Sequence, residues 1–329
     1  MTGFAEGVMA YHAYPRQPRA GEPPVIWQDG TTRVLDYGPA NGKALFIVPS
    51  LVNRAYILDL AEGRSFCRWL SARGFRPLLV DWGAPGPEEK DFGLDAYIAT
   101  RLQGAFDAAR GETGKPIGVV GYCMGGNLAL ALAHRNPGAV SALALLATPW
   151  DFHAGMGGKT GMLAAALPQL DMVLEACGEM PVDTIQAFFT GIDPFGPSEK
   201  FRRFAGHHTP GEQADLFVAL EDLLNDGVPL AANTARDCLR DWYVENLPAR
   251  GGWRVGGTPV IPEEVDVPTL LAIPERDHIV PPASARALLD ALPRVEALSV
   301  PAGHIGMMAG SRAEAGLYQP LARWLGEIL

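Results

Sequence analysis

Length, composition and charge exclude several classes of protein. The chain has 329 residues, of which 48% are hydrophobic and 19% charged, a profile typical of a globular protein with a sizeable core. The net charge of −10 and the absence of any run of Lys and Arg argue against a nucleic-acid-binding surface. The N-terminal residues lack the basic start and apolar stretch of a signal peptide, and no apolar run approaches the ~20 residues of a membrane-spanning helix, so we expect a cytoplasmic protein.

Strand-like and helix-like patterns alternate along most of the chain. After an irregular, Pro-rich opening, short apolar runs typical of buried strands occur at 32–35, 44–48, 77–80, 117–120, 143–147, 269–273 and 297–300. Apolar residues at helical spacing predict helices around 62–73, 94–110 and 128–134. Continuous apolar strands separated by helices indicate an α/β fold, with a mostly parallel central sheet and helices on both faces.

Residues 151–250 interrupt this alternation, because the segment is rich in Gly and Pro, has helical patterns and contains no convincing strand. A helical insertion between two core strands is most simply a cap over the sheet edge where ligands bind. We therefore predict a core formed by residues 1–150 and 251–329, with a cap insertion at 151–250. Several aromatic residues favour a closed apolar chamber, although packing within the cap explains them equally well; they include Phe188, Phe189, Phe195, Trp242 and Tyr243.

A cysteine occupies the sharpest predicted turn. Gly121-Tyr-Cys-Met-Gly125 lies between a predicted strand and a predicted helix. A nucleophile in such a strained turn needs small residues two positions before and after it, which is the nucleophile elbow of the α/β-hydrolase fold with Cys123 in place of serine. The helix N-terminus favours the thiolate, and we expect the amide of Met124 to bind an oxyanion. The alternative is a Gly-rich turn that holds a buried thiol.

The order of nucleophile, acid and base in this fold indicates the other two catalytic residues. Asp277 and His304 each follow one of the last two predicted strands, and glycines flank His304. We expect His304 to act as the base toward Cys123 and Asp277 to orient it. Glu275 and His278 compete with Asp277 for the place of the acid.

The remaining polar motifs concern a second oxyanion donor and a metal site. The loop Pro49-Ser-Leu-Val-Asn53 follows an early strand, so the amide of Val52 is the candidate donor. Asn53 is expected to brace this loop or, alternatively, to cap the following turn. His207 and His208 are adjacent, but no cysteine or carboxylate spacing completes a metal site, and we expect neither a metal nor a cofactor.

Five stretches, taken in order, resemble the polyhydroxyalkanoate synthase family. The likeness runs from about Leu45 to His304, with gaps in the predicted cap. It is closest to the short class III synthases, which work with a separate partner subunit, and Val80-Asp-Trp-Gly83 and Val255-Gly-Gly257 support that choice. The five stretches are Leu51-Val-Asn-Arg-Ala-Tyr-Ile-Leu-Asp59, Gly121-Tyr-Cys-Met-Gly-Gly126, Thr148-Pro-Trp-Asp-Phe152, Asp277-His-Ile-Val-Pro-Pro282 and Gly303-His-Ile-Gly306.

The resemblance implies an acyltransferase that polymerises 3-hydroxyacyl coenzyme A through an acyl thioester on Cys123, with His304 and Asp277 completing the triad. It also implies a partner synthase subunit and a location at polymer granules, and a homodimer is consistent with it. Two alternatives stay open. A thioesterase or an ester or lactone hydrolase would use the same triad in a wet site, and a non-catalytic granule-associated relative would keep the fold without the activity.

The expected substrate is anionic, which indicates where its binding residues lie. Arg240, Arg250 and Arg254 near the predicted cap mouth are expected to hold the phosphates of coenzyme A. His278, beside the predicted acid, is a further candidate for contact with the substrate.

Overall fold

Alternate residues of the central strands are buried on opposite faces of one sheet. The computed structural model describes residues 2–192, 196–206 and 211–329. On β3 (Lys43–Val48), Phe46 belongs to the hydrophobic cluster on one face and Leu45 to the cluster on the other, and both are fully buried. A strand buried on both faces shows the continuous apolar run that predicts β3 from the sequence.

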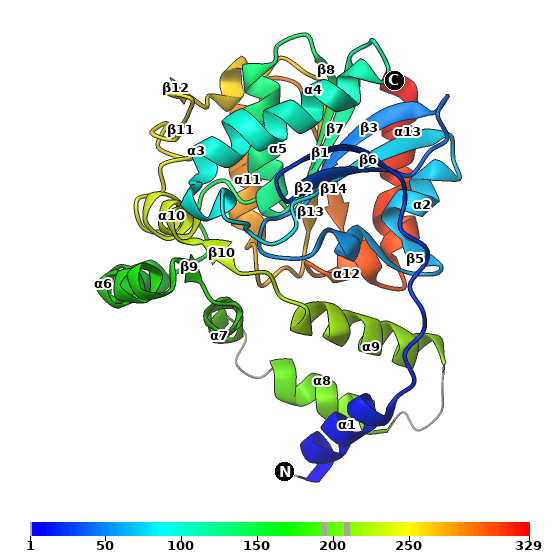
Figure 1. The fold of residues 1–329 in the computed structure, drawn as a ribbon, viewed down its shortest axis with the longest axis vertical. Helices are drawn as coiled ribbons and strands as arrows, with labels where there is room; N and C mark the ends of the chain where they lie inside the picture. Colours follow the sequence, from blue (N-terminus) through cyan, green and yellow to red (C-terminus); the bar gives the residue numbers. More distant parts are fainter. Residues whose placement is uncertain (1, 193–195, 207–210) are drawn as a thin grey trace.

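Eight strands form the sheet in the order β1-β2-β6-β3-β7-β8-β13-β14 (Figure 1). Neighbours pair parallel, except that β1 pairs antiparallel with β2 and β2 with β6. The mostly parallel α/β fold is therefore confirmed, and β1 is the strand that the sequence patterns do not predict. The other bounds are Val25–Asp29 (β1), Thr32–Asp36 (β2), Phe75–Asp81 (β6), Ile117–Tyr122 (β7), Val140–Leu146 (β8), Thr269–Pro274 (β13) and Val295–Val300 (β14).

Helices cover both faces of the sheet, as predicted. One hydrophobic cluster contains buried side chains of α4 (Gln103–Gly111), α5 (Met124–Arg135) and α11 (Pro282–Ala291). The other contains those of α2 (Phe66–Ser71), α12 (Gly306–Ala309) and α13 (Gln319–Ile328). Shorter elements complete the core: η1 (Ala55–Leu58), β4 (Asp59–Ala61), β5 (Arg64–Ser65), η2 (Glu89–Asp91), α3 (Leu94–Ala96), η3 (Tyr97–Leu102), β11 (Arg254–Val255), β12 (Thr258–Pro259), η5 (Pro262–Glu264) and η6 (Glu314–Tyr318).

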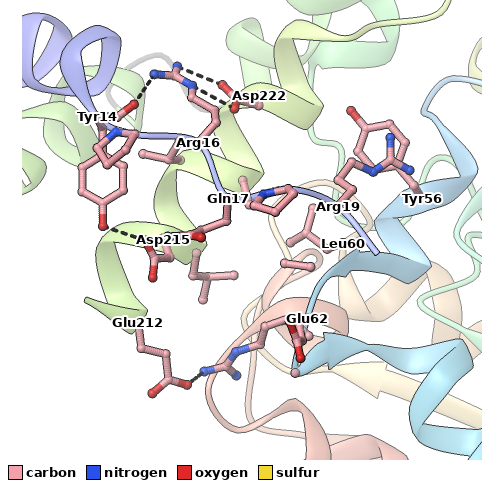
Figure 2. A pocket seen from close by; sticks show the side chains of 18 residues that line it. Tyr14, Arg16, Gln17, Arg19, Tyr56, Leu60, Glu62, Glu212, Asp215 and Asp222 are labelled. Carbon is pink, nitrogen blue, oxygen red and sulfur yellow. Dashed lines mark hydrogen bonds and ion pairs between the residues drawn. The ribbon is translucent and has the colours of Figure 1, made fainter. Parts of the chain in front are cut away.

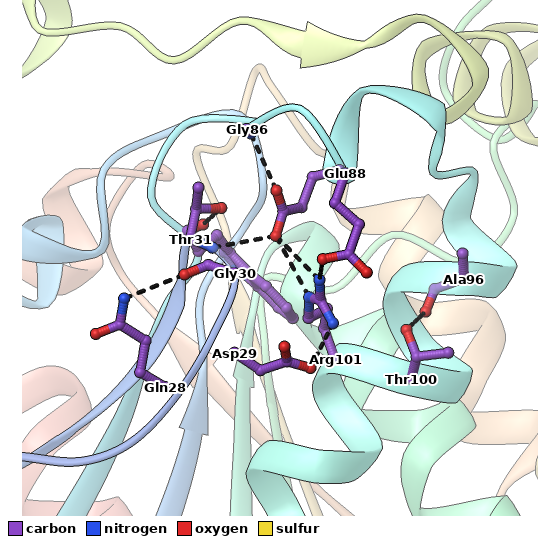
Figure 3. A network of polar contacts seen from close by, with 11 residues as sticks. Gln28, Asp29, Gly30, Thr31, Gly86, Glu88, Ala96, Thr100 and Arg101 are labelled. Carbon is purple, nitrogen blue, oxygen red and sulfur yellow. Dashed lines mark hydrogen bonds and ion pairs between the residues drawn. The ribbon is translucent and has the colours of Figure 1, made fainter.

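A buried arginine ties the edge hairpin β1–β2 to the helices beside it (Figure 3). Arg101, on the π-helical turn η3, forms ion pairs with Asp29, Glu88 and Glu89, and its side chain is only 5% exposed. Glu89 also accepts a hydrogen bond of 3.1 Å from the amide of Thr31. Because a buried charge is tolerated only when it is paired, this network fixes the hairpin against the core.

Between β8 and β13 the chain leaves the sheet and forms several helices. We call α6 (Lys159–Cys177), α7 (Val182–Ile192), α8 (Gly196–Phe204) and α9 (Glu212–Asn225) the cap helices; Figure 1 shows them at one end of the sheet. The chain returns through α10 (Ala232–Arg236) and the π-helical turn η4 (Asp237–Val244). The expectation that this segment holds no strand is wrong, since β9 (Glu179–Met180) pairs with β10 (Leu230–Ala231). A two-residue ladder is too short to leave a periodic sequence pattern.

The N-terminal segment forms a helix where the sequence predicts irregular structure. Helix α1 (Thr2–Ala13) lies beside α8 in Figure 1, and the hydroxyls of Tyr11 and Tyr14 donate to Asp222 and Asp215 of α9. The apolar residues of α1 form no clear stripe, so contacts with remote cap helices stabilise it rather than its own pattern. Within the described ranges, no helix combines the length and apolar character needed to span a membrane.

Candidate active site

The backbone at Cys123 changes from strand to helix within one residue. Strand β7 ends at Tyr122, α5 begins at Met124, and Cys123 between them has φ 57° and ψ −129°. A side chain at Gly121 would meet Gly126, and one at Gly125 would meet the carbonyl of Val48. The glycines on both sides of Cys123 are therefore required by close backbone approach, as the elbow motif predicts.

The structure brings His304 and Asp277 together. His304 Nδ1 lies 2.6 Å from Asp277 Oδ2, and both side chains are buried. Asp277 Oδ1 accepts hydrogen bonds from the amides of Ile279 at 2.8 Å and Val280 at 2.9 Å. These bonds fix the carboxylate, which in turn orients the imidazole, and the charge of Cys123 acts on the same imidazole.

Electrostatics favour the protonated form of His304. Burial by itself lowers the pKa of His304, but a thiolate at Cys123 and hydrogen bonds to Asp277 and Cys123 outweigh burial and raise the pKa to about 10. The imidazole is therefore protonated at neutral pH when Cys123 is a thiolate. A thiolate beside an imidazolium is the reactive form of a cysteine nucleophile.

Tyr122 supports the histidine loop in a way that the sequence analysis missed. Its ring stacks on His304, with centroids 5.2 Å apart and an interplanar angle of 29°. Its hydroxyl donates a 3.1 Å hydrogen bond to the backbone carbonyl of His304. The only sequence signal was an aromatic residue directly before Cys123, which does not identify a partner 182 positions away.

Cys123 opens into a cavity of about 330 Å³ between the core and the cap helices. Helices α6 and α7 and the turn η4 form much of its wall, and no residue of its described lining is charged. The hydroxyl-bearing members of the lining are Ser50, Thr184 and Tyr243. The full set is Ser50, Val52, Cys123, Met124, Pro149, Phe152, Leu163, Ala166, Leu170, Met180, Thr184, Ile185, Ala187, Phe188, Leu230, Ala235, Cys238, Leu239, Trp242, Tyr243, Ile279 and Val280.

A buried asparagine joins two walls of this cavity, and the sequence analysis missed it as well. Asn246 Oδ1 accepts a 2.9 Å hydrogen bond from the amide of Phe152, and its Nδ2 donates to Asp151 at 2.9 Å. Asn246 itself has a positive φ of 51°. It thereby holds the chain after β8 against the end of η4, so the segments that carry Phe152 and Tyr243 keep a fixed position relative to each other. Asp151 and Phe152 belong to a stretch that the sequence analysis singled out only for its resemblance.

Some of the other predicted site residues line the cavity and some lie outside its lining. Met124 and Val52 line the cavity, and the Val52 amide donates a 3.3 Å hydrogen bond to Ser50 Oγ. Asn53 is not part of the cavity lining, and His278 is exposed. Of the competitors for the acid, Glu275 accepts a hydrogen bond from Ser299 instead. His207, His208 and Phe195 lie outside the described residues, as does the side chain of Phe189.

The three arginines predicted to bind phosphate are exposed and lie outside the cavity lining. Arg240 pairs with Asp241 at 2.8 Å, and Arg250 lies 3.8 Å from Glu245. Arg254 donates to the carbonyl of Gly257 at 2.9 Å. No group of three potential metal ligands occurs among the residues that the structure describes.

A second cavity, of about 700 Å³, lies away from Cys123 (Figure 2). The chain after α1, the β4–β5 hairpin and helix α9 form its walls. Its described lining contains no Cys, Ser or His, and several of its charges are paired, such as Arg16 with Asp222 at 3.1 Å and Arg64 with Glu212. It therefore offers no nucleophile, and the smaller cavity is the candidate active site.

Comparison with known proteins agrees with the observed fold. Residues 49–317 match the model of the "Alpha/beta hydrolase family". An esterase from Thermogutta terrifontis superposes with a TM-score of 0.58 and 16% identity, covering 95% of this chain and 99% of that one, which shows a shared fold.

Two curated relatives carry the name "Poly(3-hydroxyalkanoate) polymerase subunit PhaC". The protein from Synechocystis sp. is 31% identical over 297 residues, which are 86% of this chain and 77% of the relative. The protein from Haloferax mediterranei is 29% identical over 313 residues, and the match spans 92% of this chain but only 63% of that relative. The chain thus belongs to the alpha/beta hydrolase family and, within it, to the poly(3-hydroxyalkanoate) polymerase family of enzymes.

Proposed function

We propose that this protein is an acyltransferase that polymerises 3-hydroxyacyl coenzyme A into polyhydroxyalkanoate through an acyl thioester on Cys123. One observation carries the proposal: the cysteine at the elbow opens into an uncharged cavity, and its charge is a cause of the raised pKa of His304, which Asp277 holds at 2.6 Å. The names of the relatives supply the substrate class. Cytoplasmic or granule location, a partner subunit and a homodimer are parts of the same proposal.

The first half-reaction loads the cysteine. The thiolate of Cys123 attacks the carbonyl carbon of the substrate thioester, and the amide of Met124 stabilises the oxyanion. The amide of Val52 is the second donor once it leaves its bond to Ser50 Oγ. The bond from that carbon to the coenzyme A sulfur breaks, and the imidazolium of His304 gives its proton to the leaving sulfur. One thioester replaces another, so the acyl group on Cys123 remains activated.

The second half-reaction transfers the acyl group to a hydroxyl. Loading removes the thiolate, which is one of the causes that raise the pKa of His304, so the imidazole becomes a base. It then takes the proton from the 3-hydroxyl of another hydroxyacyl unit, whose oxygen attacks the acyl carbon of the enzyme thioester. The bond from that carbon to Cys123 breaks, and the thiolate–imidazolium pair is restored.

The cavity favours transfer over hydrolysis. Its lining is overwhelmingly apolar, so water finds few hydrogen-bond partners beside the acyl enzyme. The phosphates of coenzyme A would have no charged partner inside, so they would lie at the mouth. The exposed Arg240, Arg250 and Arg254 are proposed to bind them there. Replacing all three by Gln is expected to raise the KM for the coenzyme A thioester, and an unchanged KM would discard this part.

The test is to incubate the purified protein with 3-hydroxybutyryl coenzyme A, to follow release of free coenzyme A, and to assay the product. Release with polymer as the product supports the proposal. Release with free 3-hydroxybutyrate as the product would identify a thioesterase on this scaffold instead. The Cys123→Ala variant serves as the control, because release that persists in it does not come from the proposed nucleophile.

A further inference from the structure

Tyr243 stands in the wall of the active-site cavity that the cap side supplies. It lies on the π-helical turn η4, a distortion that is frequent at functional sites. Its ring is held edge-on by two aromatic neighbours, Phe152 with centroids 5.0 Å apart and Phe188 with centroids 5.7 Å apart. The side chain is therefore fixed in a single orientation within the cavity that also contains Cys123.

The hydroxyl of Tyr243 has no hydrogen-bond partner in the part of the chain that the structure describes. Six of the eight tyrosines donate to a carboxylate or a carbonyl, including Tyr122, whose ring stacks on His304. A polar group in an apolar cavity loses its bonds to water without replacing them. An unpaired hydroxyl that lines a ligand cavity thus indicates a partner supplied by the ligand.

This hydroxyl acts as a donor. Burial, followed by the negative charge at Cys123, raises the pKa of Tyr243. Tyr243 therefore keeps its proton throughout the neutral range. Its ligand partner is then an acceptor oxygen, and that oxygen would lie in the cavity that both Tyr243 and Cys123 line.

The acyl group of a 3-hydroxyacyl thioester brings only two oxygens into the cavity. The carbonyl oxygen has its own proposed donor on the core side, the amide of Met124, which the amide of Val52 joins once it leaves Ser50 Oγ. The oxygen on C3 is the one left without a partner. We propose that the Tyr243 hydroxyl donates a hydrogen bond to this C3 oxygen and makes the enzyme select 3-hydroxyacyl over plain acyl thioesters, an inference that rests on the proposed function.

Selectivity of this kind follows from what each substrate leaves unpaired. A 3-hydroxyacyl group satisfies the Tyr243 hydroxyl and has its own C3 oxygen satisfied, whereas a plain acyl group leaves that hydroxyl unpaired. Removing the Tyr243 hydroxyl should therefore lower kcat/KM for the 3-hydroxyacyl substrate and leave kcat/KM for the plain acyl substrate unchanged. Loss of one neutral hydrogen bond in a dry site corresponds to about a tenfold change in rate.

The experiment compares two thioesters that differ by a single oxygen. Single-turnover release of coenzyme A is measured with 3-hydroxybutyryl and with butyryl coenzyme A, for the wild type and for Tyr243→Phe. We expect kcat/KM for the hydroxyacyl substrate to fall about tenfold and kcat/KM for the butyryl substrate to change by less than about twofold. The matched control is Tyr56→Phe, which removes a hydroxyl bonded to Asp226 outside this cavity and should leave both values unchanged.

Four results would overturn the assignment. Equal losses for both substrates would mean that Tyr243 supports the carbonyl or the fold, and unchanged values for both would mean that it contacts neither oxygen. A selective loss in Thr184→Val but not in Tyr243→Phe would move the role to the other unpaired cavity hydroxyl. If neither thioester acylates wild-type Cys123, the proposed function fails and this assignment falls with it, whereas acylation that yields free acid removes only the polymerase step.

Discussion

The two cavities of this protein differ in size and in chemistry, and the difference shows which property identifies an active site. The larger one, beside the N-terminal segment, is lined by arginines and carboxylates, several of which pair with each other (Figure 2). The smaller one contains no charge in its described lining, but it has a cysteine in strained backbone and hydroxyls without partners. Paired charges are satisfied within the protein, whereas a strained nucleophile and unpaired polar groups await a ligand.

The largest expected effect comes from removing the feature that most distinguishes the two cavities. Cys123→Ala should reduce coenzyme A release by at least ~10³-fold, because the chemistry depends on covalent attachment. Cys238→Ala is the matched control. Cys238 lines the same cavity, but burial raises the pKa of its thiol well above the neutral range, so its loss should preserve most of the activity. Single-turnover rates measure both, and an inactive Cys238→Ala beside an active Cys123→Ala would contradict the assignment of the nucleophile.

A slightly smaller loss is expected when the histidine is left in place but no longer oriented. Asp277→Asn should lower the rate by roughly 10²- to 10⁴-fold, because the amide presents an N–H to His304 and favours the wrong tautomer. Glu275→Gln, a change of the same kind two residues away, removes only a bond from Ser299 and should have little effect. Steady-state kinetics with 3-hydroxybutyryl coenzyme A would compare the two variants. Equal losses of rate in both would contradict the assignment of Asp277 as the acid.

The pH dependence of loading sharpens the same comparison. The folded-state pKa of His304 is raised to about 10 from its ordinary value of 6.5, so the imidazolium that protonates the leaving sulfur persists through neutral pH. The single-turnover rate should therefore decline as pH rises through about 10. Asp277 is one cause of the raised pKa, so Asp277→Asn should move this decline to lower pH. A rate that falls with the same midpoint in both proteins would contradict the proposed proton donor.

The candidate active site contains residues that the sequence could predict and residues that it could not. The elbow, Asp277 and His304 follow from local patterns, because glycine spacing and the ends of buried strands mark their positions along the chain. Tyr122 and Asn246 act through contacts with residues far away in the sequence, at 304 and 152, and no periodicity encodes such pairs.

The arginines show a different limit, because an anionic substrate predicts cationic partners but does not say where in the fold they lie. Arg240, Arg250 and Arg254 were chosen because coenzyme A is anionic, yet all three point to solvent or to neighbours of their own segment. The edge strand β1 was missed because none of its five residues is fully buried, and three of them, Val25, Gln28 and Asp29, are exposed. Local pattern thus fixed the core, and the cap and the edges depend on tertiary contacts.

The smallest effect is expected at the larger cavity, and it concerns stability rather than activity. Asp222→Ala removes the acceptor for Tyr11 and Arg16, which join the N-terminal segment to α9. Because these groups are partly exposed and screened by solvent, the free energy of unfolding should fall by only about 1 kcal/mol. Urea titration measures this loss, with Glu62→Gln, whose carboxylate has no partner among the described residues, as a control expected to change nothing. Loading of Cys123 in Asp222→Ala should stay within about twofold of the wild type. A loss of loading activity without a loss of stability would mean that the larger cavity also takes part in function.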